Sequence, residues 1–556
     1  MKKDGYKPLS RIIQLILTDR KDIVSIYFFA IMSGLVQLSL PLGVQAIISF
    51  VLGATMVTSI YVLIFVIVLG VFLVGAFQIN QMKIIEKIQQ NIFVRNTYLF
   101  AEVLPQIDLM KSNNYYLPEK ITRFFDVMSV QKGISKLLLD IPIASIQIIF
   151  GLLLLSFYHP IFIAFGFLLL LFLVLILWFT GKKGIETNYV VITHKYEVAA
   201  WFGEIGRVVK SFKFRHGTQL NISKADEKSV KYIKARTKHF SVLLLQYKAL
   251  VLFKVLITVT MLAVGTYLLL EQKLNIGEFI AAEIVILSII GAVEKLIGSI
   301  SNVYDVITGL EKLSSVTESP LEKNGKVEFK SINSGVSVEL TDCNITYPNN
   351  KTVLKNMNFK IPSNSIVGIT GCSGSGKTSL LNLLSGNLGD DNGGVLINNI
   401  ALGNYNLESL RKKMGVFLYN TDVFEGTVLE NITMGRQGIT QEEITKLAYE
   451  LGFSSFIQSL KNGFETEVDP AGKKMSTTSV QIIILLRAFI EKPDFLLLEE
   501  PWNNFNKELK DSFIDYIFNK MEDTTLVIAT NDSSYLEKVD IVLELNKGEV
   551  LVSKNK

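Results

Sequence analysis

The sequence is poor in charged residues. Only 19% of its 556 residues are Asp, Glu, Lys or Arg, whereas 49% are hydrophobic, and the mean hydropathy is +0.37. Soluble domains carry about 25% charged residues, so this balance indicates a membrane protein. The net charge of +5 is small and dispersed, which argues against a nucleic-acid-binding protein.

Cysteine is also scarce. Cys343 and Cys372 have no metal-binding spacing, and their small number agrees with a reducing cytosolic environment. A cleavable signal peptide is not predicted, because residues 1–22 lack a continuous apolar core and a small-residue cleavage site. Apolar residues there fall on one helical face, which predicts an amphipathic elbow lying on the membrane surface.

Long apolar stretches are what the sequence has in excess. A membrane-spanning helix needs about 20 apolar residues, and the predicted spans form three hairpins with short outer connections. The long segments between hairpins, 81–135 and 181–246, are rich in Lys and Arg, so these segments and both chain termini are predicted to be cytoplasmic. The predicted spans are 24–50, 57–80, 136–157, 161–180, 247–271 and 277–302.

A few ionisable residues lie inside these spans, namely Asp140, Lys254, Glu283 and Glu294. Equal spacing from the last outer turn puts Lys254 and Glu294 at a similar depth, so the two side chains can form a pair. One interpretation is a polar lining of a translocation path. The alternative is that both side chains reach toward the cytoplasmic surface.

The strongest motif is GCSGSGKTS at 371–379, between a β-branched stretch and a helix-forming stretch. This context is the one that a phosphate loop requires. Backbone N–H groups of such a loop surround a phosphate, the lysine adds positive charge, and the threonine hydroxyl binds Mg²⁺. The predicted nucleotide-binding residues are Gly371, Cys372, Ser373, Gly374, Ser375, Gly376, Lys377, Thr378 and Ser379, of which Lys377 is also predicted to be catalytic.

The segment PDFLLLEE at 493–500 is typical of a buried strand that ends on two carboxylates. In nucleotide hydrolases such a strand directs one carboxylate toward Mg²⁺ and the next toward the attacking water. We therefore predict that Glu499 and Thr378 lie on the metal side and that Glu500 is catalytic. A solvated turn is the alternative interpretation.

Six spans followed by a phosphate-loop domain resemble the type I exporter family of ABC transporters. The resemblance covers essentially the whole chain and includes VFEGTVLENI at 423–432 and the helix that follows MSTTS at 475–479. PLGVQAIISFVL at 41–52 resembles the first span of the haemolysin and bacteriocin export branch. Segments 114–127 and 203–214 match the cytoplasmic loops whose short transverse helices press on the ATPase domains.

The resemblance implies an all-α membrane domain of six helices followed by an α/β ATPase domain of the ABC type. It implies ATP and Mg²⁺ as cofactors, with Tyr347 stacking on adenine and Ser476 contributing its hydroxyl from the signature. The implied partners are a second half-transporter, identical or different, the lipid bilayer, an exported peptide or protein, a periplasmic adaptor and an outer-membrane channel. The implied location is the bacterial inner membrane. The implied domains are the elbow at 1–22, the membrane domain at 23–315, a linker at 316–335 and the nucleotide-binding domain at 336–556.

Several positions depart from the family pattern. Threonine cannot take up a proton and carry positive charge as histidine can, and loss of such a group costs phosphoryl transfer on the order of 10²-fold. Hydrolysis is therefore expected to be slow or to depend on a partner, and the rival reading is a regulatory pseudo-ATPase that does not hydrolyse ATP. A lipid or small hydrophobic substrate also stays open. The departures are Tyr419 at the lid glutamine, Thr477 and Thr478 at the signature glycines, Glu499 at the metal-side aspartate and Thr530 at the switch histidine.

Overall fold

The computed structural model describes residues 17–53, 57–108, 110–111, 120–214, 217–331, 335–347, 351–389, 394–419 and 421–554. Most of the predicted elbow and part of the segment 114–127 lie outside the described residues. The chain divides into two compact units. One unit is Met1–Pro105 with Tyr116–Ser319, and the other is Gln106–Tyr115 with Pro320–Lys556.

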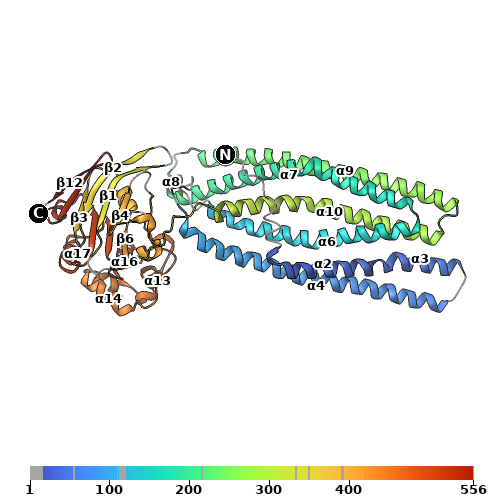
Figure 1. Ribbon diagram of the computed structural model, residues 1–556, viewed down its shortest axis with the longest axis horizontal. Helices are drawn as coiled ribbons and strands as arrows, with labels where there is room; N and C mark the ends of the chain where they lie inside the picture. Colours follow the sequence, from blue (N-terminus) through green and yellow to red (C-terminus); the bar gives the residue numbers. More distant parts are fainter. Residues whose placement is uncertain are drawn as a thin grey trace. The chain divides into compact units, whose positions relative to one another are not determined.

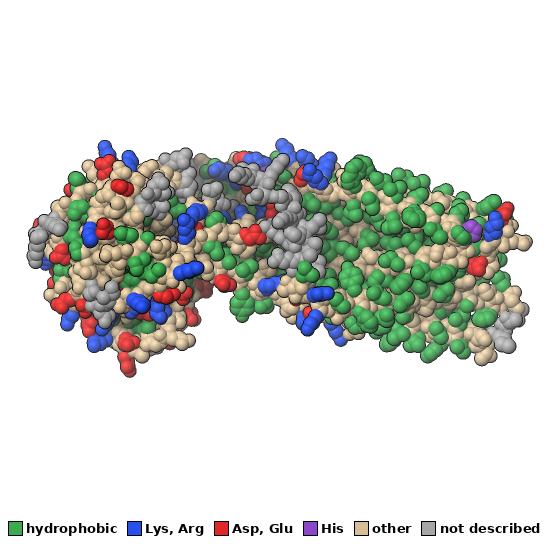
Figure 2. Space-filling model, in the orientation of Figure 1, with side chains coloured by type: hydrophobic (Ala, Val, Ile, Leu, Met, Phe, Trp, Pro, Cys, Tyr) green, Lys and Arg blue, Asp and Glu red, His purple; other side chains and the backbone are tan. Residues whose placement is uncertain are grey.

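The first unit is helical (Figure 1). Within the described residues, six of its helical stretches are long and apolar enough to cross a membrane, which confirms the six predicted spans as helices. Hydrophobic side chains cover much of its visible surface (Figure 2). Its elements are α2 (Arg20–Gln37), α3 (Ser39–Leu52), α4 (Val57–Val103), η1 (Leu104–Gln106), η2 (Thr122–Phe125), α6 (Asp126–Tyr158), α7 (Ile161–Arg207), α8 (Val209–Lys213), α9 (Leu220–Leu270) and α10 (Ile276–Thr317).

Polar contacts join the long helices of this unit. The Gln246 side-chain amide on α9 donates to the Thr180 hydroxyl on α7 at 2.7 Å and to the Tyr304 hydroxyl on α10 at 2.9 Å. The expected pair between α9 and α10 is present, because Lys254 Nζ lies 2.5 Å from Glu294 Oε2. These contacts pair polar side chains of neighbouring helices with one another, which lowers the cost of placing them in an apolar environment.

The second unit is an α/β domain with two main sheets. The antiparallel sheet has the order β2-β1-β4-β5, and the larger sheet has the order β12-β11-β3-β10-β9-β6, with every pair parallel except β11 and β12. The strands are β1 (Val338–Thr346), β2 (Thr352–Ile361), β3 (Ile366–Thr370), β4 (Gly394–Ile397), β5 (Ile400–Ala401), β6 (Met414–Phe417), β7 (Gly426–Thr427), β8 (Glu467–Val468), β9 (Phe495–Glu499), β10 (Thr525–Ala529), β11 (Ile541–Asn546) and β12 (Glu549–Lys554).

The helices of this unit cover the larger sheet and help to form two hydrophobic clusters. Strands β3, β10 and β9 are neighbours, so their carboxyl ends meet at one edge of the sheet. Ligands of parallel α/β sheets bind at this edge. The helices are α11 (Lys377–Leu384), η3 (Leu402–Asn404), α12 (Leu407–Arg411), α13 (Val428–Thr433), α14 (Gln441–Glu450), α15 (Ser454–Ser459), η4 (Gly463–Glu465), η5 (Pro470–Gly472), α16 (Thr477–Phe489), α17 (Lys507–Lys520) and α18 (Ser533–Leu536).

Residues 320–329, which we call the linker strand, are attached to the α/β domain by backbone hydrogen bonds. The Gly325 N–H donates to the Tyr405 carbonyl at 2.8 Å, and the Val327 N–H donates to the Asn404 carbonyl at 2.9 Å. A Cβ atom on Gly325 would lie 2.0 Å from the Asn404 carbonyl, so glycine permits this close approach. The other edge of the linker strand pairs with residue 107, opposite Leu321.

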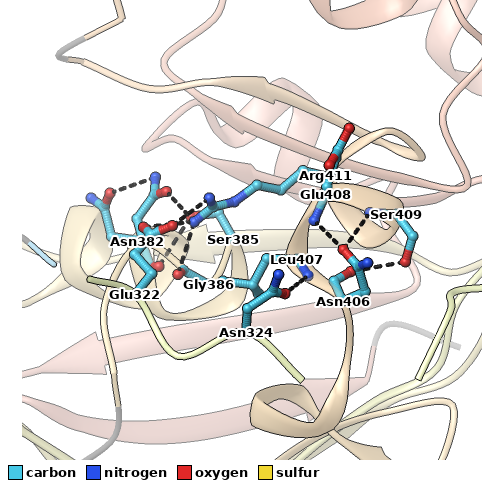
Figure 3. A network of polar contacts seen from close by, with 11 residues as sticks. Glu322, Asn324, Asn382, Ser385, Gly386, Asn406, Leu407, Glu408, Ser409 and Arg411 are labelled. Atoms are coloured by element: carbon cyan, nitrogen blue, oxygen red, sulfur yellow. Dashed lines mark hydrogen bonds and ion pairs between the residues drawn. The ribbon is translucent and has the colours of Figure 1, made fainter. Parts of the chain in front are cut away.

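An arginine ties the linker strand to the helix that follows the phosphate loop (Figure 3). Both carboxylate oxygens of Glu322 accept from the Arg411 guanidinium, at 2.7 and 2.9 Å. The same guanidinium donates to the Gly386 carbonyl at 3.2 Å, just beyond the end of α11. The chain that leaves α10 is therefore fixed to the carboxyl end of the helix that begins at Lys377.

Candidate nucleotide site

The phosphate loop connects β3 to α11. Its glycines have positive φ angles of 145° at Gly371, 80° at Gly374 and 113° at Gly376, where L side chains are strained. The Lys377 ammonium donates to the carbonyls of Gly371, at 2.5 Å, and Cys372, at 3.3 Å, so it is folded back over the loop. The Ser375 hydroxyl is buried without a hydrogen-bond partner in the described chain. A bound phosphate would satisfy this hydroxyl and attract the nearby ammonium, so the loop fits the group.

The metal-side residues lie together. Glu499 Oε1 accepts a hydrogen bond from the Thr378 hydroxyl, and Oε2 accepts from the Tyr419 N–H at 3.0 Å. Hydroxyl and carboxylate oxygens side by side are the ligand type that Mg²⁺ prefers, so Thr378 and Glu499 fit a role in holding it. The Tyr419 side chain is 83% exposed, so the site uses only its backbone.

Glu500 follows β9 in an unusual backbone conformation. Its φ angle is +46°, and its N–H donates to the Ala529 carbonyl at 2.9 Å. Its side chain is half-buried, and Oε2 accepts a hydrogen bond from the Thr530 hydroxyl at 3.0 Å. The structure thus brings together the phosphate loop, Glu499, Glu500 and Thr530 at one sheet edge.

Sequence reasoning missed Asn531 as a residue of this edge. Its side-chain carbonyl accepts from the Gly371 N–H at 3.1 Å and from the Thr370 hydroxyl at 3.0 Å. It therefore fixes the start of the phosphate loop. The signal in the sequence is a polar residue just after an apolar strand, which alone does not say where the side chain points.

The remaining predicted loop residues have varied environments. The Tyr347 hydroxyl lies 3.1 Å from the Ser379 hydroxyl, and the Tyr347 ring packs at the edge of a hydrophobic cluster. Cys372 and Ser373 are exposed. The stacking of Tyr347 on adenine stays a prediction.

Ser476 is the N-cap of α16, the helix in the signature position. Its hydroxyl accepts from the Ser479 N–H at 3.0 Å and lies 2.8 Å from the Ser479 hydroxyl. Thr477 is the first residue of the helix, and the Thr478 hydroxyl donates to the Asn504 carbonyl at 3.1 Å. The sequence STTS therefore caps a helix here.

Arg487 supports the same helix from its other end. It donates to the Asn431 carbonyl at 2.7 Å and to the Asp422 carbonyl at 3.1 Å. Burial lowers the pKa of this guanidinium, the neighbouring Arg436 lowers it further, and Asp422 opposes the change. Arg487 therefore holds the segments around β7 and α13 against α16.

Comparisons with known proteins agree with this geometry. The ABC transporter family matches residues 354–503. A Rickettsia bellii protein assigned as an export ATP-binding/permease protein is 30% identical over 254 residues, which are 45% of this chain and 44% of that protein. The leukotoxin translocation ATP-binding protein LktB of Mannheimia glucosida is 27% identical over 52% of this chain and 40% of its own length. The chain spans about half the length of the curated relatives it matches.

A structural relative covers almost the whole chain. The structure of a bacterial Atm1-family ABC exporter with ATP bound has a TM-score of 0.84, covering 96% of this chain and 95% of that chain. The sequences are 17% identical, so the likeness concerns the fold. The molecule is therefore a multi-pass membrane protein with a fused ATP-binding domain. Residues 354–503 match the ABC transporter family, and the chain has the fold of an ABC exporter, which confirms the predicted resemblance and fold class.

Proposed function

We propose that this chain is one half of an ATP-driven exporter in the bacterial inner membrane, with both termini in the cytoplasm. A second half-transporter, identical or different, completes the pump. ATP closes the nucleotide-binding domains, and the cytoplasmic segments pass that closure to the spans. The observation that carries the proposal is the phosphate loop beside Glu499 and Glu500, in a chain that also has six helices able to cross a membrane.

Different residues of the site bind ATP and hydrolyse it. The backbone N–H groups of the phosphate loop and the Lys377 ammonium bind the phosphates. These donors point toward the place that the negatively charged phosphates occupy. Thr378 and Glu499 hold Mg²⁺, which when bound neutralises charge on the outer phosphates. Glu500 orients the attacking water and accepts its proton.

Hydrolysis is proposed to be slow or partner-dependent. The Thr530 hydroxyl points to Glu500 and carries no positive charge, and Thr477 and Thr478 stand where the family has glycines. The rival is a pseudo-ATPase that only binds nucleotide. Glu499 supports this rival function, because both of its carboxylate oxygens already accept hydrogen bonds from the protein.

An exported peptide or protein is the proposed substrate. Support comes from the first-span resemblance to the haemolysin and bacteriocin branch and from similarity to a leukotoxin translocation protein. A periplasmic adaptor and an outer-membrane channel are the proposed partners, by resemblance to the same branch. A lipid or small hydrophobic substrate is the alternative.

Lys377→Ala is expected to weaken ATP binding about 30-fold, because one charge-assisted hydrogen bond contributes about 2 kcal/mol. The full chain in lipid nanodiscs would be titrated with a fluorescent ATP analogue, and phosphate release would be measured in parallel. Lys446→Ala, an exposed lysine on α14, is the matched control and should bind normally.

The same assay separates the two readings. Phosphate release by the chain alone that Lys377→Ala removes would exclude the pseudo-ATPase. Release that persists in Glu500→Gln would exclude the catalytic role of Glu500. Equal binding by wild type and Lys377→Ala would contradict the nucleotide site itself.

A further inference from the structure

The end of β10 holds Glu500 at two points. The Ala529 carbonyl accepts the backbone N–H of Glu500 at 2.9 Å, and the next residue, Thr530, donates its hydroxyl to the Glu500 carboxylate at 3.0 Å. The backbone of Glu500 is in the left-handed region, which is unfavourable for a residue with a side chain. The contact with Ala529 fixes that backbone, and the contact with Thr530 fixes the carboxylate.

Thr530 is itself rigidly held. It is 1% exposed, and its N–H donates to the Ile369 carbonyl on β3 at 2.9 Å. Its hydroxyl oxygen accepts the Asp532 N–H at 3.3 Å, which directs the hydroxyl proton away from that side. Asp532 in turn forms an ion pair with Lys510.

A threonine hydroxyl has one proton to donate. In this site that proton goes to Glu500 Oε2, so it is not available to the γ-phosphate. This hydrogen bond holds one oxygen of the carboxylate and so restricts the rotation of the Glu500 side chain.

We propose that Thr530 is a positioning residue that orients the Glu500 carboxylate for the attacking water, rather than a phosphate-binding group. This inference rests on the proposed ATPase function. The sequence places Thr530 only at the position of the switch histidine and assigns no contact to its hydroxyl. Loss of the hydroxyl should therefore lower turnover and leave ATP affinity intact.

The test compares Thr530→Val, Thr530→Ser and Thr524→Val in the full chain in nanodiscs. Thr530→Val removes the hydroxyl at constant shape, and phosphate release at saturating ATP is expected to fall at least about tenfold, since misplaced catalytic groups cost this much or more. Binding of a fluorescent ATP analogue should change less than about twofold. Thr530→Ser should retain turnover. Thr524→Val is the control, a buried threonine whose hydroxyl bonds to the Pro493 carbonyl, and it should match wild type.

A double-mutant cycle with Glu500→Ala separates positioning from general structural damage. Thr530→Val should lower turnover in the wild type but cause no further loss of residual turnover beside Glu500→Ala. An equal loss in both backgrounds, or a matching loss in Thr524→Val, would overturn the proposal. Weakened ATP binding by Thr530→Val would assign Thr530 to the phosphate instead.

A second readout does not depend on hydrolysis. The midpoint of thermal unfolding should show non-additive effects of Thr530→Val and Glu500→Ala, because the two side chains share a hydrogen bond. Additive effects would overturn the positioning role. If the wild type releases no phosphate with or without a partner, the hydrolytic part of the proposed function is wrong. The double-mutant cycle measured by thermal unfolding then decides whether Thr530 holds Glu500.

Discussion

Gly371→Ala is expected to abolish ATP binding by this chain. The residue has a φ angle of 145°, a region that L side chains rarely adopt. A Cβ atom there would lie 2.3 Å from the Leu545 carbonyl oxygen on β11 and 2.8 Å from the Ser375 hydroxyl oxygen. Because the first obstacle is the backbone of a central strand, the phosphate loop must move instead. Strain and overpacking together should cost about 3 kcal/mol.

Gly374→Ala is the matched control, because it changes the same loop by the same atom. Gly374 also has a positive φ angle, of 80°, but a Cβ atom there has nothing within 4 Å. We expect it to lower the free energy of unfolding by about 1 kcal/mol and to retain ATP binding. Fluorescent nucleotide titration and thermal unfolding of both variants test this difference. Equal effects would show that backbone freedom, and not the contact with Leu545, decides the role of Gly371.

Arg411→Ala is expected to release the linker strand from the end of α11. The change removes the paired hydrogen bonds to Glu322 and the bond to the Gly386 carbonyl, and leaves a largely buried carboxylate without its cation. Hydrogen bonds to charged groups contribute about 1.5–3 kcal/mol, and partial exposure places this loss near about 2 kcal/mol.

Thermal unfolding of the full chain checks this expectation. Lys360→Ala is the control, because its ion pair with Glu339 is exposed and should contribute less than about 1 kcal/mol. The swapped pair Glu322→Arg with Arg411→Glu should recover part of the stability. Equal effects of Arg411→Ala and Lys360→Ala would contradict the anchoring role.

Different parts of this molecule were predictable to different degrees. The six membrane helices and the phosphate loop follow from long apolar stretches and from a glycine pattern between a strand and a helix, which are signals within one segment. The strand that ends at Glu499, directly before Glu500, was predicted correctly, because a short apolar run with terminal acids is itself a local pattern. Whether these residues bind and hydrolyse ATP stays a prediction.

Contacts between distant segments were not predictable. From the sequence, Glu499 is only a longer residue at the position of the family's aspartate. The fold shows that its two carboxylate oxygens accept hydrogen bonds from Thr378 and Tyr419. The direction of the Thr530 hydroxyl depends on Glu500 and Asp532, each held by other segments. The orientation of such side chains is set by tertiary packing, so it cannot be predicted from the sequence around each residue.

The linker strand has a consequence for any attempt to study the ATP-binding domain as a separate fragment. A fragment beginning at residue 336, the boundary that the sequence suggests, would cut away Glu322, Gly325 and Val327. It would expose backbone groups near Asn404 that are now paired, and Arg411 would lose its carboxylate. A fragment beginning at Pro320 retains these contacts but still lacks the partner strand at residue 107. The domain boundary that the sequence suggests therefore does not coincide with a point at which few hydrogen bonds connect the two sides.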